Sequence, residues 1–144
     1  MSNVNNLQKP ATGPLALRVL IAALGAAIIN NLYSIGYTAV TGFSIPEVIN
    51  AFSVTTFSVV PVLVGGVVYW IASRYSVKLA NVGLTIGTII LFILFYVPSF
   101  GETITTPQGT MEAPDGFAWL SFGLHFAGPI LLLALVPEWR RKSG

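Results

Sequence analysis

Residues 15–38 read LALRVLIAALGAAIINNLYSIGYT, and this stretch decides the fold. Its one charged residue, Arg18, lies near the start, where a long side chain can reach the membrane surface. About 20 apolar residues in a helix that rises ~1.5 Å per residue cross the ~30 Å hydrocarbon core of a bilayer. We therefore predict a membrane-spanning helix over residues 15–38.

Three further apolar runs follow, at about residues 48–73, 79–97 and 117–136. They are continuous and do not alternate as the strands of a membrane barrel do, so each predicts a helix. Of all 144 residues, 54% are hydrophobic and 8% charged, against roughly 25% charged in soluble domains. The sequence predicts an all-α bundle of four transmembrane helices over residues 15–141, after a flexible tail at 1–14.

The distribution of charge predicts how the chain threads. All seven basic residues fall on one side of the predicted spans: Lys9, Arg18, Arg74, Lys78, Arg140, Arg141 and Lys142. The segments on the other side have none and hold Glu47, Glu102, Glu112 and Asp115. Because loops rich in lysine and arginine stay inside, we expect both termini and the 74–78 loop in the cytoplasm of a cell whose plasma membrane the chain crosses.

Composition also bears on function. The chain has no cysteine, which excludes disulfides and cysteine-ligated metals. No acidic residue or lysine falls within a predicted span, which disfavours a proton-driven pump. Seven dispersed basic residues form no stripe for nucleic acid, and we expect the lipid bilayer, and either a larger membrane complex or further copies of the chain, as partners.

Uncharged polar residues within the spans are the candidate site. The six that we single out, as a ligand site or an interhelical polar cluster, are Asn30, Asn31, Thr55, Ser58, Ser121 and His125. Ser121 and His125 are four residues apart and share a helix face. From the helical rise, Asn30 and His125 fall at similar depths, just outside the midplane. Gly83 and Gly87 in the third run form a weak GxxxG match.

Two prolines fall within spans. Pro61 and Pro129 have no N–H and cannot bond the carbonyls of Phe57 and His125. We expect the second and fourth helices to bend at these residues, and the freed carbonyls to need another donor in lipid.

The single histidine has a structural reading and two functional ones. We predict that His125 hydrogen-bonds Asn30 or Asn31 across the bundle. A contact with a substrate, pigment or ion pathway is the first alternative, and haem ligation the second. One histidine supplies one axial ligand, so haem or pigment binding through His125 would need a partner chain. We expect no cofactor, no metal site and no catalytic residue, because no acid pair, nucleophile set, phosphate loop or metal cluster is found.

The ending GFAWLSFGLHFAGPILLLALVPEWRR, with its central histidine and its "VP" before a basic tail, resembles an uncharacterised bacterial family of four-helix membrane proteins. The resemblance covers about residues 15–141 and implies architecture rather than activity. The segment TTFS at 55–58 is similar to one in small four-helix fluoride channels. There it follows a break in the third helix, whereas here it is in the second run, and those channels pair in opposite orientations, which a one-sided charge distribution disfavours.

Two function classes follow. The first is a non-enzymatic membrane protein, either an accessory subunit of a larger complex or a bundle that binds a small molecule. The second is a channel or transporter for a small solute or ion that acts as a homo-oligomer.

Overall fold

The structure is a computed structural model that describes residues 12–96, 101, 103–106 and 109–137. Its helices are α1 (Thr12–Thr41), α2 (Ala51–Ser73), α3 (Val77–Tyr96), α4 (Phe117–Leu124) and α5 (Ala127–Leu135). Four stretches are long and apolar enough to cross a membrane, and α4 and α5 together make the fourth, Phe117–Leu135. This confirms the predicted all-α bundle of four membrane-spanning segments.

Helix boundaries differ from the prediction by a few residues. α1 begins at Thr12, so residues 12–14 belong to the helix and not to the expected tail, and residues 1–11 lie outside the described part. Pro14 falls in the first turn, where a missing N–H costs nothing. α2 begins at Ala51 rather than near 48, because Asn50 caps it: its side chain accepts from the Ser53 N–H, and Ser53 accepts from the Asn50 N–H.

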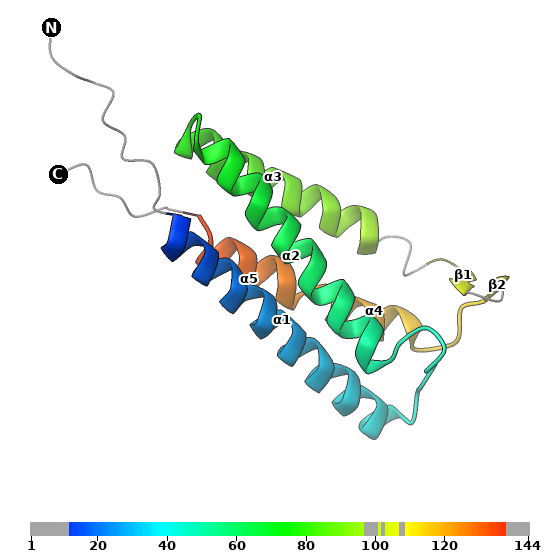
Figure 1. Cartoon of the computed structure of the whole chain (residues 1–144). Coiled ribbons are helices and arrows are strands. Elements are labelled where there is room, and N and C mark those ends of the chain that lie inside the picture. The colour runs from blue at the N-terminus through cyan, green and yellow to red at the C-terminus, as the bar shows by residue number, and fades with distance from the viewer. Residues whose placement is uncertain (1–11, 97–100, 102, 107–108, 138–144) are drawn as a thin grey trace, which may run out of the picture.

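The spans alternate in direction. The beginning of α1, the turn between α2 and α3 and the end of α5 lie at one end of the bundle, which we call the basic end (Figure 1). Arg18, Arg74 and Lys78 are near this end, and the Arg74 guanidinium lies 4.5 Å from the centre of the Trp70 ring. The opposite, acidic end holds Glu47, Glu112 and Asp115 among the described residues.

A short β-hairpin that we did not predict lies at the acidic end. β1 (Thr103–Thr106) pairs antiparallel with β2 (Gly109–Glu112), with Thr103 opposite Glu112 and Thr106 opposite Gly109. The β-branched run Thr-Ile-Thr-Thr, separated by two residues from Gly109, is a hairpin signal that we did not use.

The hydrophobic core fills the half of the bundle nearer the basic end. It is made of Leu15, Val19, Ala22, Ala23 and Ala26 of α1, Val62 and Tyr69 of α2, Ala80 and Leu84 of α3, and Leu132 and Val136 at the end of the chain's fourth span. Alanines on α1 let its backbone approach its neighbours closely, as small residues do in membrane bundles. Within this half the Tyr69 hydroxyl donates to Asn81 Oδ1 at 2.8 Å, and both residues are buried.

Candidate functional site: the broken fourth span and the polar face of α1

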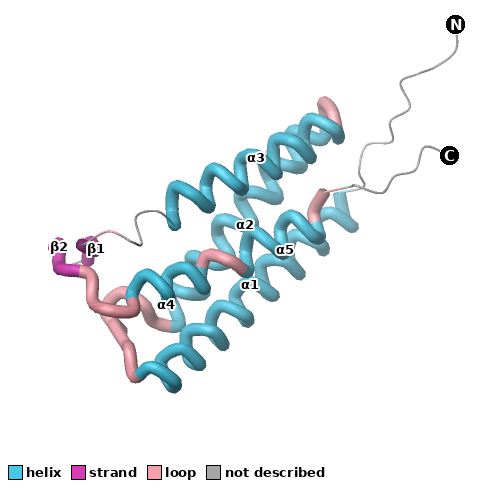
Figure 2. The backbone as a smooth tube through the Cα atoms, turned by 180° about the vertical axis from the view of Figure 1, so that it is seen from behind, coloured by secondary structure: helices cyan, strands magenta, loops and turns pink. Residues whose placement is uncertain are grey.

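The fourth span is interrupted near its middle, where a short loop separates α4 from α5 (Figure 2). α4 ends at Leu124 and α5 begins at Ala127, with His125 and Phe126 between them. The N–H of His125 is shared between the carbonyls of Ser121 and Phe122, at 3.1 Å each, which tightens the end of α4. The predicted bend at Pro129 is therefore an interruption one turn earlier, which leaves Pro129 in the first turn of α5, where proline is tolerated.

Pro61 has a different outcome. α2 continues through Pro61 as one helix from Ala51 to Ser73. The bend that we expect at this residue stays a prediction.

Three side chains of α1 donate to backbone carbonyls of the fourth span. Asn30 Nδ2 donates to the Leu124 carbonyl at 2.7 Å. The hydroxyls of Tyr33 and Tyr37 donate to the carbonyls of Trp119 at 2.8 Å and Gly116 at 2.9 Å. The donors are three and four residues apart, so they form one face of α1. We call them the α1 donor row, and they tie α4 to α1 along its whole length.

Asn30 also joins a third helix. Its Nδ2 donates to Ser58 Oγ of α2 at 2.8 Å, and the Ser58 hydroxyl donates to the Val54 carbonyl at 2.6 Å. Asn30 is 3% exposed and Ser58 5%. The side-chain amide of Asn30 thus connects α1 both to α2 and to the end of α4. Its bond to Leu124 gives a donor to a backbone carbonyl beside the interruption.

Our prediction that His125 bonds Asn30 or Asn31 is wrong. The Asn30 amide bonds the carbonyl of Leu124, the residue before the histidine, and Asn31 Nδ2 donates to the Ala27 carbonyl and to Thr55 Oγ1. His125 Nδ1 lies 2.6 Å from the Ser121 carbonyl and 3.4 Å from Ser121 Oγ. The backbone carbonyl of Leu124, beside the break, accepts the amide hydrogen bond that we predicted for the imidazole.

The six predicted site residues therefore form three groups. Asn30 and Ser58 are buried between α1 and α2, Asn31 and Thr55 meet nearer the surface of the same two helices, and Ser121 and His125 lie on the fourth span. Asn30 joins the first group to the fourth span through the backbone of Leu124 alone.

Tyr33 and Gly123 belong to the site and were missed. A Cβ atom on Gly123 would overlap the ring of Tyr33, so the lack of a side chain at this position lets the tyrosine reach α4. Gly116, with φ 91°, caps the start of α4 in a left-handed conformation that suits glycine, beside the Tyr37 hydroxyl. Tyr33 lies three residues after Asn30, and that helical spacing could have added it to the candidate site.

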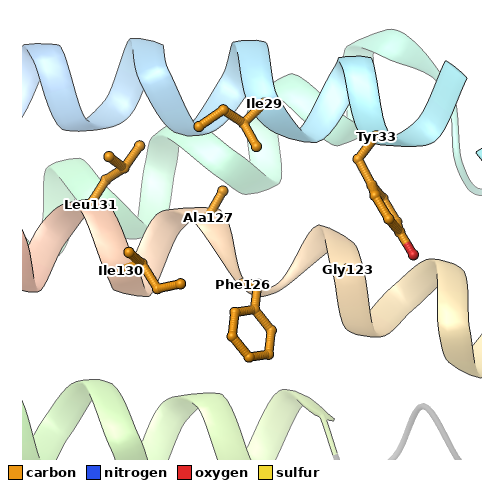
Figure 3. A pocket seen from close by; sticks show the side chains of 7 residues that line it. All are labelled: Ile29, Tyr33, Gly123, Phe126, Ala127, Ile130 and Leu131. Carbon is orange, nitrogen blue, oxygen red and sulfur yellow. The ribbon is translucent and has the colours of Figure 1, made fainter. Parts of the chain in front are cut away.

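A groove opens between α1 and the interrupted span (Figure 3). Its volume is about 240 Å³, and it is lined by Ile29, Tyr33, Gly123, Phe126, Ala127, Ile130 and Leu131. The only side-chain polar atom among these residues is the Tyr33 hydroxyl, which already donates to Trp119. Ile29, Phe126 and Ile130 are 48%, 41% and 54% exposed, so the groove opens toward the surface that faces lipid.

Aromatic rings pack between the interruption and α3, on the side away from α1. Phe126 packs edge-on against Phe92 of α3, with ring centres 5.4 Å apart, and against Phe122, 4.7 Å apart. Trp119 extends this cluster toward the acidic end. The cluster connects α3 to the fourth span near the acidic end, where the hydrophobic core does not reach.

Among the residues that the structure describes, no group of three or more histidine, aspartate and glutamate side chains could hold a metal ion. No family model, no curated protein and no solved structure matches the chain. What the fold defines is a class, the multi-pass membrane proteins with four helical spans. The resemblance of the last span to a bacterial four-helix family stays a prediction.

Proposed function

We propose that this chain is a non-enzymatic membrane protein that binds the hydrocarbon chain of a lipid in the groove between α1 and the broken fourth span. The observation that carries the proposal is the groove itself: about 240 Å³, apolar, and open toward the bilayer. It is smaller than the ~300–1,000 Å³ of typical drug-sized sites. That size suits one chain end rather than a large ring system.

The lining explains why the occupant is a hydrocarbon chain. The one lining hydroxyl, on Tyr33, already donates its proton to the Trp119 carbonyl, so a polar ligand would find a single acceptor oxygen and no donor among the lining side chains. A molecule that enters from the side comes from the lipid phase, where hydrocarbon chains are the abundant apolar solute. The break between α4 and α5 makes the space, because Phe126 turns toward α3 and away from α1 (Figure 3).

A small-solute channel or transporter is the alternative, and fewer observations favour it. A pore needs a wet, polar path, whereas the buried pair Asn30 and Ser58 is bonded across α1 and α2, and the groove is apolar. A role as accessory subunit is compatible with lipid binding, since a lipid chain held at the surface can form part of a contact with another membrane protein.

The test uses a fatty acid with a diazirine group near its methyl end, photo-crosslinked to the protein in lipid vesicles. Peptides that contain residues 29–33 or 123–131 should be labelled. Ile130→Trp should fill the groove and reduce this labelling several-fold. The matched control is Ile86→Trp on α3, because Ile86 is 53% exposed and Ile130 54%, and only Ile130 lines the groove.

Labelling spread evenly over all exposed apolar residues would contradict the proposal, and so would full labelling of Ile130→Trp. Circular dichroism of each variant in the same vesicles checks that a loss of labelling is not a loss of fold.

A further inference from the structure

A polar pair faces outward at the seam between α1 and α2. Asn31 Nδ2 donates to Thr55 Oγ1 at 3.0 Å and to the Ala27 carbonyl at 2.8 Å. Asn31 is only half-buried, Thr55 is exposed, and both lie within stretches that can cross the membrane. Polar side chains inside a bilayer almost always face the interior of a bundle, so this outward pair needs an explanation.

Within the described residues, two groups of this pair take part in no hydrogen bond: the acceptor Oδ1 of Asn31 and the hydroxyl proton of Thr55. Both N–H groups of Asn31 are used, and within the described part of the chain its Oδ1 accepts from no group. Thr55 accepts from Asn31, and its own hydroxyl proton is donated to no described residue. Ser58, one turn on, differs because its hydroxyl donates to the Val54 carbonyl. In hydrocarbon, the free acceptor and donor at Asn31 and Thr55 would each be costly.

These two leftover groups complement each other. A two-fold axis along the membrane normal would place Thr55 of one copy against Asn31 Oδ1 of the other, and the reverse, so that two equivalent hydrogen bonds form. Such pairing requires both copies to thread the same way, so that the groups meet at one depth. The one-sided placement of basic residues enforces this.

We propose that the Asn31–Thr55 surface binds a second copy of this chain in the same membrane, with Thr55 of each copy donating to Asn31 of the other. Apolar side chains flank the pair at three- and four-residue steps. Ile28 and Ile35 on α1 are 61% and 67% exposed, and Phe52 on α2 is 81% exposed. These side chains supply the packing that joins membrane helices.

The dimer surface and the lipid groove are independent. Ile29 lines the groove and Asn31 forms the proposed contact, and at 3.6 residues per turn two residues are separated by ~200° around the helix. Dimerisation would thus leave the groove open to lipid, and the failure of either proposal leaves the other standing.

The experiment measures dimerisation in lipid vesicles by energy transfer between labelled copies over a range of protein-to-lipid ratios. Loss of both reciprocal bonds, at about 0.6 kcal/mol each, should weaken dimerisation about tenfold in Asn31→Leu and in Thr55→Val. Thr55→Ser retains the hydroxyl and should dimerise as the wild type does. Gly83→Ala on α3 is the control, because nothing lies within 4 Å of the added Cβ and α3 is outside the proposed surface.

Mixing the two single variants gives the sharpest readout. An Asn31→Leu copy retains the donor and a Thr55→Val copy retains the acceptor, so a mixed pair forms one of the two bonds while either homodimer forms none. Mixed pairs should therefore exceed the random half of all dimers. A purely structural role for these residues within one chain would give no such preference.

Three outcomes would overturn the proposal. The first is a wild-type protein that stays monomeric at every ratio, which would leave lipid or water as the cover of this surface. The second is a dimer that neither substitution weakens. The third is a dimer that Gly83→Ala weakens instead, which would place the contact on α3.

Discussion

At the scale of single residues, the contact between α1 and the fourth span depends on the absence of a side chain at Gly123. The ring of Tyr33 occupies the space that any side chain there would fill, and its hydroxyl reaches the carbonyl of Trp119. Ile29 lies four residues before Tyr33 on α1, and the two side chains form one wall of the groove. A glycine thus determines where a tyrosine lies, and the tyrosine shapes the groove.

We expect Gly123→Ala to lower the free energy of unfolding by about 1–3 kcal/mol, because the methyl group would push Tyr33 aside. Gly87→Ala should be neutral or stabilising by up to about 1 kcal/mol, since its Cβ would meet no atom within 4 Å and alanine favours helix. Unfolding in a denaturing detergent measures both.

The double variant Gly123→Ala with Tyr33→Ala adds a check on the cause. If the ring is what the methyl group strikes, the two changes are coupled and the alanine at 123 costs little once the ring is gone. Additive losses would contradict this explanation.

Asn30→Leu should cost about 1–2 kcal/mol, because it removes the bonds to Ser58 and to the Leu124 carbonyl, and interhelical bonds in membranes average about 0.6 kcal/mol, with a maximum near 1.7. Ser34→Ala on the same helix is the control. Thermal unfolding in one detergent compares them. Equal stability of Asn30→Leu and the wild type would mean that the Leu124 carbonyl finds another donor.

The sequence singled out Asn30 and Ser58 as polar residues within the spans, but it did not predict the carbonyl that Asn30 binds. The choice of Asn30 and Ser58 followed from their polar side chains within apolar runs. The acceptor at Leu124 did not, because it is a backbone atom whose freedom arises only once the fourth span is broken. The predicted bond from His125 to Asn30 or Asn31 does not form, and the Nδ1 atom of His125 lies against the Ser121 carbonyl one turn earlier in the chain.

At the scale of elements, two prolines in similar sequence settings give different helices. Pro61 lies in the middle of α2, which stays continuous, whereas Pro129 lies in the first turn of α5 after an interruption. The difference follows from what supplies the missing hydrogen bonds. Asn30 donates to the Leu124 carbonyl beside the break, so the fourth span can end and begin again within the bundle.

We predict unequal effects on stability when the two prolines are replaced. Proline in a helix interior costs about 3 kcal/mol, so Pro61→Ala, at an exposed position, should raise the midpoint of thermal unfolding. Pro129→Ala should change the midpoint little, because proline in a first turn costs almost nothing. An equal gain from Pro129→Ala would show that the proline imposes the break and that the donor row only follows it.

At the scale of the whole molecule, the two halves of the bundle differ. The half nearer the basic end is closely packed around Ala22 and Ala26, with the buried Tyr69 among them. The half nearer the acidic end holds the break, the groove and the polar pairs between α1 and α2. The number of spans and their order were predictable from apolar length and composition alone. The hairpin, the break and the groove were not, because they depend on contacts between segments far apart in the chain.

Depth in the membrane and the direction of threading underlie the lipid groove and the dimer surface alike, and one measurement tests them directly. The chain has no cysteine, so single cysteines can be placed at Thr110 in β2 and at Ser143 near the C-terminus, and treated in intact cells with a thiol reagent that cannot cross membranes. We predict that Thr110→Cys reacts and that Ser143→Cys reacts only after the cells are opened. The reverse pattern, or equal reactivity of both in intact cells, would contradict four spans with cytoplasmic ends.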